Sequence, residues 1–104
     1  MNDLEALRCN AAQACDLLRL LANPIRFKVL CRLNAGELSV AELARRTGTK
    51  QSSLSQHLSK MREAGLVVIR RDGHRVLYSR AGHDAERVMA VLERCHCPLP
   101  DGAD

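Results

Sequence analysis

The chain has 104 residues, enough for one domain with a modest core and too few for most multidomain enzymes. Hydrophobic residues make up 46% and charged residues 27%, an ordinary globular balance, and no apolar run reaches the roughly 18 residues typical of a membrane span. The N-terminus lacks the basic and then apolar pattern of a secretory signal. We therefore expect a single domain over residues 1–104, soluble and cytoplasmic, with no membrane partner.

Positive charge is concentrated in one third of the chain. The formal net charge is +4, and residues 50–80 hold seven Lys and Arg residues against two acids. A solvated basic face is the plain interpretation of this excess, and contact with a polyanion such as DNA is slightly favoured. Aromatic residues make up only 2%, so the core must be aliphatic and stacking platforms for single-stranded nucleic acid are nearly absent.

Apolar spacing predicts two helices in the first third of the chain. Residues 3–22 carry apolar side chains every three or four positions, which is typical of an amphipathic helix. Asn23 is a plausible N-cap and Pro24 the first position of a second helix, which Gly36 ends.

Residues 39–64 predict two short helices joined by a tight turn. Ser39 and Glu42 have the spacing of a capping box, in which each side chain satisfies the other's free amide at a helix start. Gly48 turns the chain, and Thr49 can cap the next helix. The segment is therefore predicted to be a helix-turn-helix.

The remaining segments predict a hairpin and a final helix. Residues 66–80 hold two runs rich in β-branched residues around Asp72-Gly73, a dipeptide favoured in hairpin turns. A last helix is expected over residues 83–97, where Pro98 ends it, and residues 98–104 are expected to be a flexible tail. The order α-α-α-α-β-β-α predicts a mainly α winged helix-turn-helix with a small β-hairpin, the wing.

The fourth predicted helix and the wing carry the candidate DNA-binding residues. Outside its apolar stripe, the first half of this helix is polar, and such side chains can reach base edges in the major groove. The basic wing is expected to contact the flanking backbone or minor groove and to supply affinity rather than sequence choice. A solvated Ser-rich helix and a basic turn remain the alternative for each feature alone. The candidates are Lys50, Gln51, Ser52, Ser55, Gln56, His57, Lys60, Arg70, Arg71, His74 and Arg75.

Two long runs resemble a known family. KQSSLSQHLSKMREAGLV, residues 50–67, resembles the recognition-helix signature of the ArsR/SmtB family of bacterial winged-helix repressors, and LLRLLANPIRFKVLCRL, residues 17–33, resembles the start of that family's second helix. The resemblance covers about residues 15–97. It implies double-stranded operator DNA with an inverted repeat, a homodimer joined through residues 1–22 and 83–97, and release of DNA on induction.

Five cysteines are more than the packing of so short a chain needs, although each alone could be a small buried hydrophobe. A reducing compartment argues against permanent disulfides. Cys31, in the run Leu30-Cys31-Arg32-Leu33, and Cys97 resemble the cysteine pair of the family's redox- and persulfide-sensing branch. This resemblance implies that oxidation, or bridging by reactive sulfur, joins Cys31 to Cys97 and releases the operator. Cys95 stays open as the alternative partner.

Metal or metalloid sensing through thiolates is the alternative function. Cys95-His96-Cys97, with Cys9 or Cys15 of the partner, could bind arsenite, cadmium or zinc. The family's thiol metal site corresponds to residues 37–43, which hold no cysteine, and its last-helix zinc site maps poorly onto this chain. We therefore assign no metal ligand and no cofactor.

Enzyme chemistry has little support. A thiol oxidoreductase needs Cys-x-x-Cys at a helix start, and a cysteine hydrolase needs an organised Cys-His pair, and neither pattern is visible. We expect no enzymatic activity and name no catalytic residue.

Overall fold

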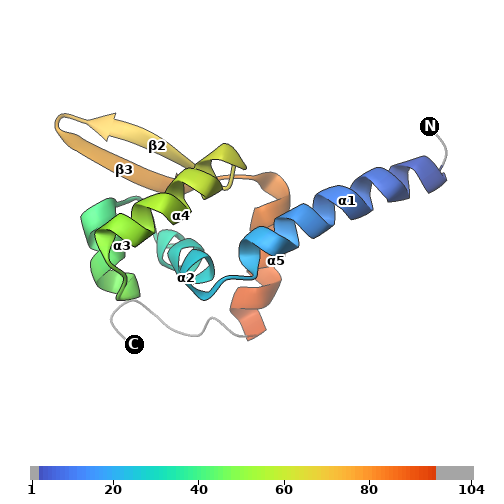
Figure 1. Ribbon diagram of the computed structural model, residues 1–104, viewed down its shortest axis with the longest axis horizontal. Helices are drawn as coiled ribbons and strands as arrows, with labels where there is room; N and C mark the ends of the chain where they lie inside the picture. Colours follow the sequence, from blue (N-terminus) through green and yellow to red (C-terminus); the bar gives the residue numbers. More distant parts are fainter. Residues whose placement is uncertain (1–2, 96–104) are drawn as a thin grey trace.

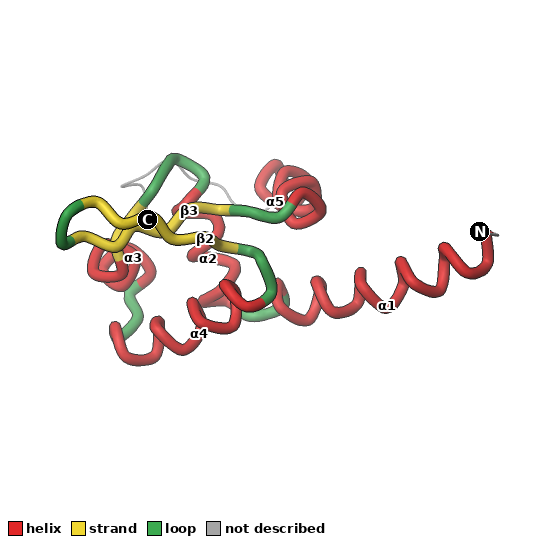
Figure 2. Tube along the Cα trace, turned by 90° about the horizontal axis from the view of Figure 1, so that it is seen from above, coloured by secondary structure: helices red, strands yellow, loops and turns green. Residues whose placement is uncertain are grey.

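The computed structural model describes residues 3–95, with side chains from residue 11 onward. The helix α1 extends away from a body in which the other elements pack around α2 (Figures 1 and 2). The described elements are α1 (Asp3–Leu21), α2 (Pro24–Leu33), β1 (Leu38–Ser39), α3 (Val40–Thr47), α4 (Gln51–Glu63), β2 (Val67–Asp72), β3 (Arg75–Arg80) and α5 (His83–Cys95). This is the predicted winged helix-turn-helix, with one short strand added. No helix within residues 3–95 is long and apolar enough to cross a membrane.

Local capping chemistry explains where α2 and α3 begin. Asn23 Oδ1 accepts hydrogen bonds from the backbone N–H groups of Ile25 and Arg26 at 3.0 and 3.1 Å. At α3, Ser39 Oγ accepts from the Glu42 N–H at 3.2 Å, and Glu42 Oε1 accepts from the Ser39 N–H at 3.3 Å. Both predicted caps are thereby confirmed.

The turn between α3 and α4 differs from the prediction in one detail. Gly48 caps α3 at φ +68°, a left-handed conformation that glycine adopts without steric cost. The expected cap by Thr49 is wrong, because the N-cap of α4 is Lys50, which makes no side-chain capping bond. The Thr49 hydroxyl instead donates to the Thr47 carbonyl at 3.5 Å. The start of α4 therefore keeps N–H groups that no side-chain cap occupies.

The sheet has three antiparallel strands in the order β1-β3-β2. β3 is central, and Asp72 pairs with Arg75 at the end of the hairpin. The two turn residues are therefore Gly73 and His74, one position later than expected. Of these two residues, Gly73 alone has a positive φ, +64°, which fits a turn that needs this conformation at its first central residue. β1 is two residues long and has no sequence signal of its own, so its pairing with β3 was not predicted.

The core is aliphatic, as expected. α4 contributes its stripe of Leu54, Leu58 and Met61, all fully buried, and this packing leaves the opposite face of the helix in solvent. Among the described side chains of α1, those near its C-terminal end reach the core, where Leu21 is buried, while Leu18 is 54% exposed.

Candidate nucleic-acid interface

The outer face of α4 presents a polar, cationic surface. The side chains of Gln51, Ser52, Ser55, Gln56 and Lys60 are all exposed, and so is Lys50 at the N-cap. The N-terminal end of a helix carries partial positive charge and free N–H groups, which favours phosphate contact. The structure therefore brings six of the predicted residues onto one surface.

His57 is less available than its neighbours on α4. It is half-buried, and its Nδ1 lies 3.3 Å from an Arg26 guanidinium nitrogen, so the neutral ring can accept a hydrogen bond. Burial, followed by the nearby charges of Arg26 and Lys60, lowers the pKa of His57. This histidine fixes α4 against α2, and a DNA contact from it requires the Arg26 contact to be shared or broken.

Arg26 is a residue that the sequence analysis missed. Its Nε donates to the Leu20 carbonyl at 2.6 Å, and its Nη2 donates to the Arg19 carbonyl at 3.2 Å. These carbonyls belong to the last turn of α1, where acceptors lack partners within the helix. One side chain thus joins α1, α2 and α4, and nothing local in the sequence signals this.

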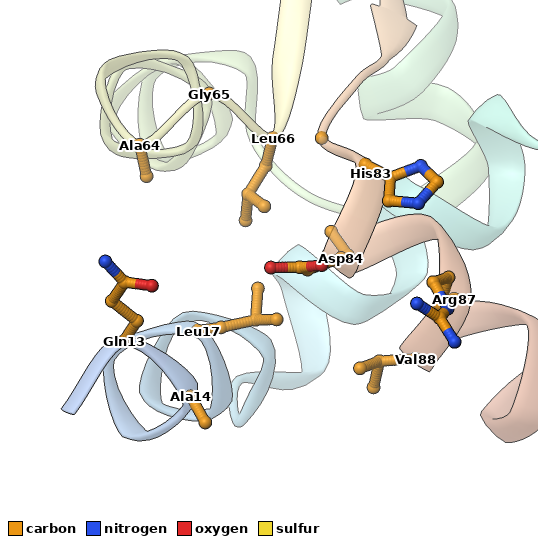
Figure 3. A pocket seen from close by; sticks show the side chains of 12 residues that line it. Gln13, Ala14, Leu17, Ala64, Gly65, Leu66, His83, Asp84, Arg87 and Val88 are labelled. Carbon is orange, nitrogen blue, oxygen red and sulfur yellow. The ribbon is translucent and has the colours of Figure 1, made fainter. Parts of the chain in front are cut away.

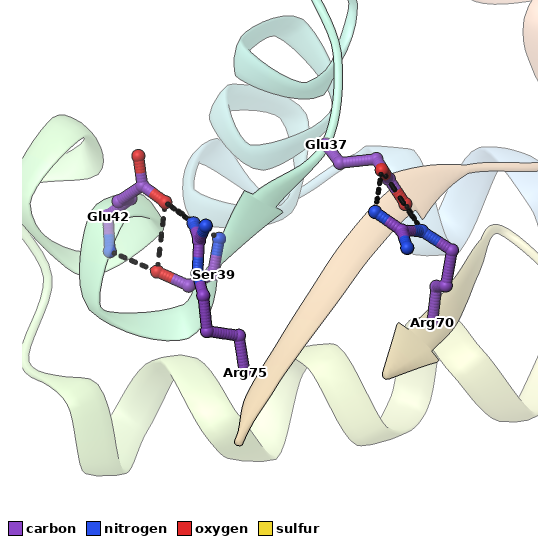
Figure 4. Close-up of polar contacts among 5 residues, drawn as sticks. All are labelled: Glu37, Ser39, Glu42, Arg70 and Arg75. Atoms are coloured by element: carbon purple, nitrogen blue, oxygen red, sulfur yellow. Dashed lines mark hydrogen bonds and ion pairs between the residues drawn. The ribbon is translucent and has the colours of Figure 1, made fainter. Parts of the chain in front are cut away.

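Two wing arginines are held by carboxylates rather than free (Figure 4). Arg70 donates through Nε and Nη2 to Glu37 at 2.9 and 2.8 Å, and this hydrogen bonding lowers the pKa of Glu37. Arg75 Nη2 lies 3.4 Å from Glu42 Oε1, whose pKa is lowered mainly by hydrogen bonds from Ser39. The wing is therefore bonded at two points, to Glu37 just before β1 and to Glu42 in the first turn of α3.

The remaining wing candidates, Arg71 and His74, are exposed next to the turn. Among the residues with described side chains, no carboxylate forms an ion pair with Arg71, in contrast to Arg70 and Arg75. Arg71 is consequently the wing arginine best placed to meet a phosphate.

The predicted sensing cysteines are described only in part. Cys31 is half-buried on α2, and its sulfur is disulfide-bonded. Cys15 and Cys95 carry free, exposed thiols. Cys97 lies outside the described residues, so its pairing with Cys31 stays a prediction.

The alternative metal site is not tested, because His96 and Cys97 also lie beyond the described part of the chain. Within that part, no group of three or more His, Cys, Asp or Glu side chains is placed to hold a metal ion.

A cavity of about 660 Å³ lies between α1, the connection from α4 to β2, and the start of α5 (Figure 3). Its walls include the apolar side chains of Leu17, Leu66 and Val88 and the polar side chains of Gln13 and Asp84. It adjoins the C-terminal end of α4, away from the Lys50 end. The cavity is thus flanked by the two helices predicted to form the dimer interface.

Comparison with known proteins identifies the family. Residues 23–68 match the family model described as bacterial regulatory protein, arsR family. The chain is 38% identical to the HTH-type transcriptional regulator YgaV of Escherichia coli K12 over 99 residues, covering 94% of this chain and all of that protein. It belongs to the arsR family of bacterial regulatory proteins.

Solved structures agree with this assignment. Reduced HlyU from Vibrio cholerae superposes with a TM-score of 0.84 at 37% identity, covering 90% of this chain and 99% of that one. The transcriptional repressor BigR from Xylella fastidiosa gives a TM-score of 0.80 at 32% identity, covering 95% of this chain and 100% of that one. Winged-helix regulators of this family bind DNA and are homodimeric. The chain is therefore a transcriptional regulator.

Proposed function

We propose that this protein is a cytoplasmic repressor that binds an inverted-repeat operator as a homodimer and releases it when Cys31 becomes joined to Cys97. The observation that carries the DNA-binding part is the solvent-facing polar surface of α4 beside a basic wing. The observation that supports the switch is the engagement of Cys31 in a disulfide bond while Cys15 and Cys95 remain free thiols.

DNA recognition is divided between α4 and the wing. Gln51, Ser52 and Ser55 are exposed at the start of α4, where side chains of a recognition helix meet base edges in the major groove. Lys60 and Arg71 supply phosphate contacts that are independent of sequence. Two copies related by a two-fold axis place their α4 helices in successive major grooves, which are about 34 Å apart along the duplex.

Dimerisation uses α1 and α5 in this proposal. Leu18 on α1 is 54% exposed and Val91 on α5 is 55% exposed, although both helices also contribute residues to the core, such as Leu21 and Met89. Two-fold association needs a self-complementary apolar surface, and these side chains contribute to one.

The switch chemistry is thiol exchange. A Cys31 thiolate attacks the outer sulfur of a low-molecular-weight persulfide, taking that sulfur and releasing the donor as a thiol. The Cys97 thiolate then attacks the inner sulfur of the Cys31 persulfide, which forms the disulfide and expels hydrogen sulfide. A peroxide reaches the same disulfide by accepting two electrons and two protons from the thiols and leaving as water. In each route the protein loses two hydrogens and gains one covalent link.

The bond between Cys31 and Cys97 affects DNA binding by changing the relative positions of the helices. Cys31 lies on α2, beside Leu30 and Val29, which are buried in the core that also seats α4. A bond from α2 to the chain after α5 changes how α5 meets the partner copy. The spacing of the two α4 helices then no longer matches successive grooves, so a local bond becomes a loss of operator affinity.

The test uses duplexes selected from a random library by the reduced protein. Fluorescence anisotropy measures affinity before and after treatment with a persulfide donor or peroxide, and we expect a fall within the roughly 5- to 150-fold range of typical allosteric coupling. Cys31→Ser and Cys97→Ser should keep their affinity after treatment, whereas the matched control Cys15→Ser should behave like the wild type. Release by treated Cys31→Ser, or release on arsenite alone, contradicts the proposed switch. Selection that yields no preferred duplex contradicts operator binding itself.

A further inference from the structure

Arg80 forms a three-way junction between β3, α2 and α5. It is the last residue of β3, and its side chain is only 7% exposed. Nε and Nη2 donate to the two carboxylate oxygens of Glu86 at 2.7 and 3.1 Å, and Nη1 donates to Glu93 at 3.0 and 3.1 Å. Glu86 and Glu93 are seven residues apart on α5 and thus lie on one face of that helix.

The same guanidinium also reaches α2. Nη1 donates to the Leu30 carbonyl at 3.0 Å. In a continued helix this carbonyl would accept from the N–H of Asn34, but that N–H donates to the Cys31 carbonyl at 3.2 Å because α2 ends there. Arg80 therefore satisfies one of the carbonyls left without a helical partner, and its positive charge lies at the negative end of the helix dipole.

The bonds of Arg80 hold β3 and α5 in a fixed relative orientation, which an exposed ion pair would not do. A guanidinium is planar and donates in fixed directions, so bidentate bonds to Glu86 and bonds to Glu93 fix its orientation relative to α5. Glu93 is itself only 17% exposed, so water cannot easily replace it. β3 is the central strand and is hydrogen-bonded to both β1 and β2. A displacement of Arg80 therefore moves the end of β3 and, through these hydrogen bonds, the wing.

We propose that Arg80 is the positioning residue that couples the thiol site to the wing. Its α2 acceptor is the carbonyl of Leu30, the residue before Cys31, and its α5 acceptors lie on the helix that leads to Cys97. A link between Cys31 and Cys97 shifts α2 relative to α5, and Arg80 passes this shift to β3 and so to the DNA-facing hairpin. This inference rests on the thiol switch proposed above and names how that switch reaches the wing.

The test replaces the guanidinium group of Arg80 with the ammonium group of a lysine. Arg80→Lys keeps the positive charge but cannot hold both carboxylates and the Leu30 carbonyl together. We measure the ratio of the operator dissociation constants of the oxidised and reduced forms. For wild type we expect a ratio in the roughly 5- to 150-fold range of allosteric coupling, and for Arg80→Lys a ratio of no more than about a third of the wild-type value. Arg19→Lys, in the exposed pair with Asp16, is the matched control and should keep the full ratio.

Outcomes separate the two proposals. If the operator dissociation constants of oxidised and reduced wild type are equal, the thiol switch is contradicted. If they differ as expected in wild type and by the same factor in Arg80→Lys, only the role of Arg80 is contradicted. A purely structural arginine would lower the melting temperature of the variant and leave the ratio intact. If Arg80→Lys does not fold, Glu93→Gln, which weakens one arm, is expected to lower the ratio in the same direction, and an unchanged ratio there overturns the proposal.

Hydrogen exchange gives a readout without DNA. Oxidation of the wild type is expected to change protection at the β3 amides near the wing, while in Arg80→Lys the change stays within α2 and α5. Equal changes at β3 in both proteins contradict the coupling role.

Discussion

The wing arginines should differ in how they respond to salt. Arg71 is exposed without a carboxylate partner among the described side chains, whereas Arg70 is neutralised by two short hydrogen bonds to Glu37. Each phosphate that a protein neutralises adds about 0.9 to the slope of log affinity against log salt. A dimer has two copies of Arg71, so Arg71→Ala should reduce this slope by about 1.8. When the salt concentration rises from 50 to 200 mM, the factor by which wild type binds more tightly than the variant should then fall about twelvefold.

The assay is anisotropy at several salt concentrations with one selected duplex. The control is the double variant Arg70→Gln with Glu37→Gln, which removes a cation and an anion together and should change the slope by less than about 0.5. A slope change in the double variant as large as that of Arg71→Ala would refute the reasoning. It would mean that Arg70 leaves Glu37 to meet a phosphate when DNA binds.

Three further predictions concern α4. Gln51→Ala should relax base preference at particular operator positions, at a cost of about 1–3 kcal/mol for each lost bidentate base contact, and a uniform loss over all duplexes in a binding-site selection would contradict a base-reading role. Leu58→Ala, at a fully buried site, should reduce the free energy of unfolding by about 2–5 kcal/mol in urea titrations, and a loss below about 1 kcal/mol would be inconsistent with its place in the core. The pKa of His57 is lowered in the folded chain, so the unfolded state binds the proton more readily and stability from this group falls as the pH drops below about 6.5. His57→Gln should therefore lose less stability than wild type between pH 7 and 5, and equal losses would argue against this.

Features with a local cause were predictable from the sequence. Asn23 and the pair Ser39 and Glu42 cap their helices within three residues, so their spacing alone identifies the starts of α2 and α3. The hairpin likewise follows from two runs rich in β-branched residues on either side of Asp72-Gly73. The resemblance to a family added the overall arrangement, which comparison with solved structures then confirmed.

Features that depend on the tertiary fold were not predictable in this way. Glu37 and Arg70 are 33 residues apart and meet only because the chain folds the wing over the start of α3. Arg26 bonds to two backbone carbonyls of α1, and Arg80 on β3 bonds to a backbone carbonyl of α2. A backbone acceptor leaves no signature in the sequence. β1 forms because its backbone hydrogen-bonds to the edge of β3, and two residues are too few to show an alternating pattern.

Intact mass measured on the same samples as DNA affinity tests the central claim most directly. The reduced protein is treated separately with a persulfide donor, a peroxide and arsenite. One portion of each sample is weighed intact and then digested without reduction to map the link, and a second, undigested portion is assayed for operator binding. We predict that treated protein loses two hydrogens or gains sulfur atoms in a link mapped to Cys31 and Cys97, and that DNA release follows the fraction linked. Retained arsenic with DNA release only in that sample, and no effect of either oxidant, would contradict the thiol switch and favour metalloid sensing.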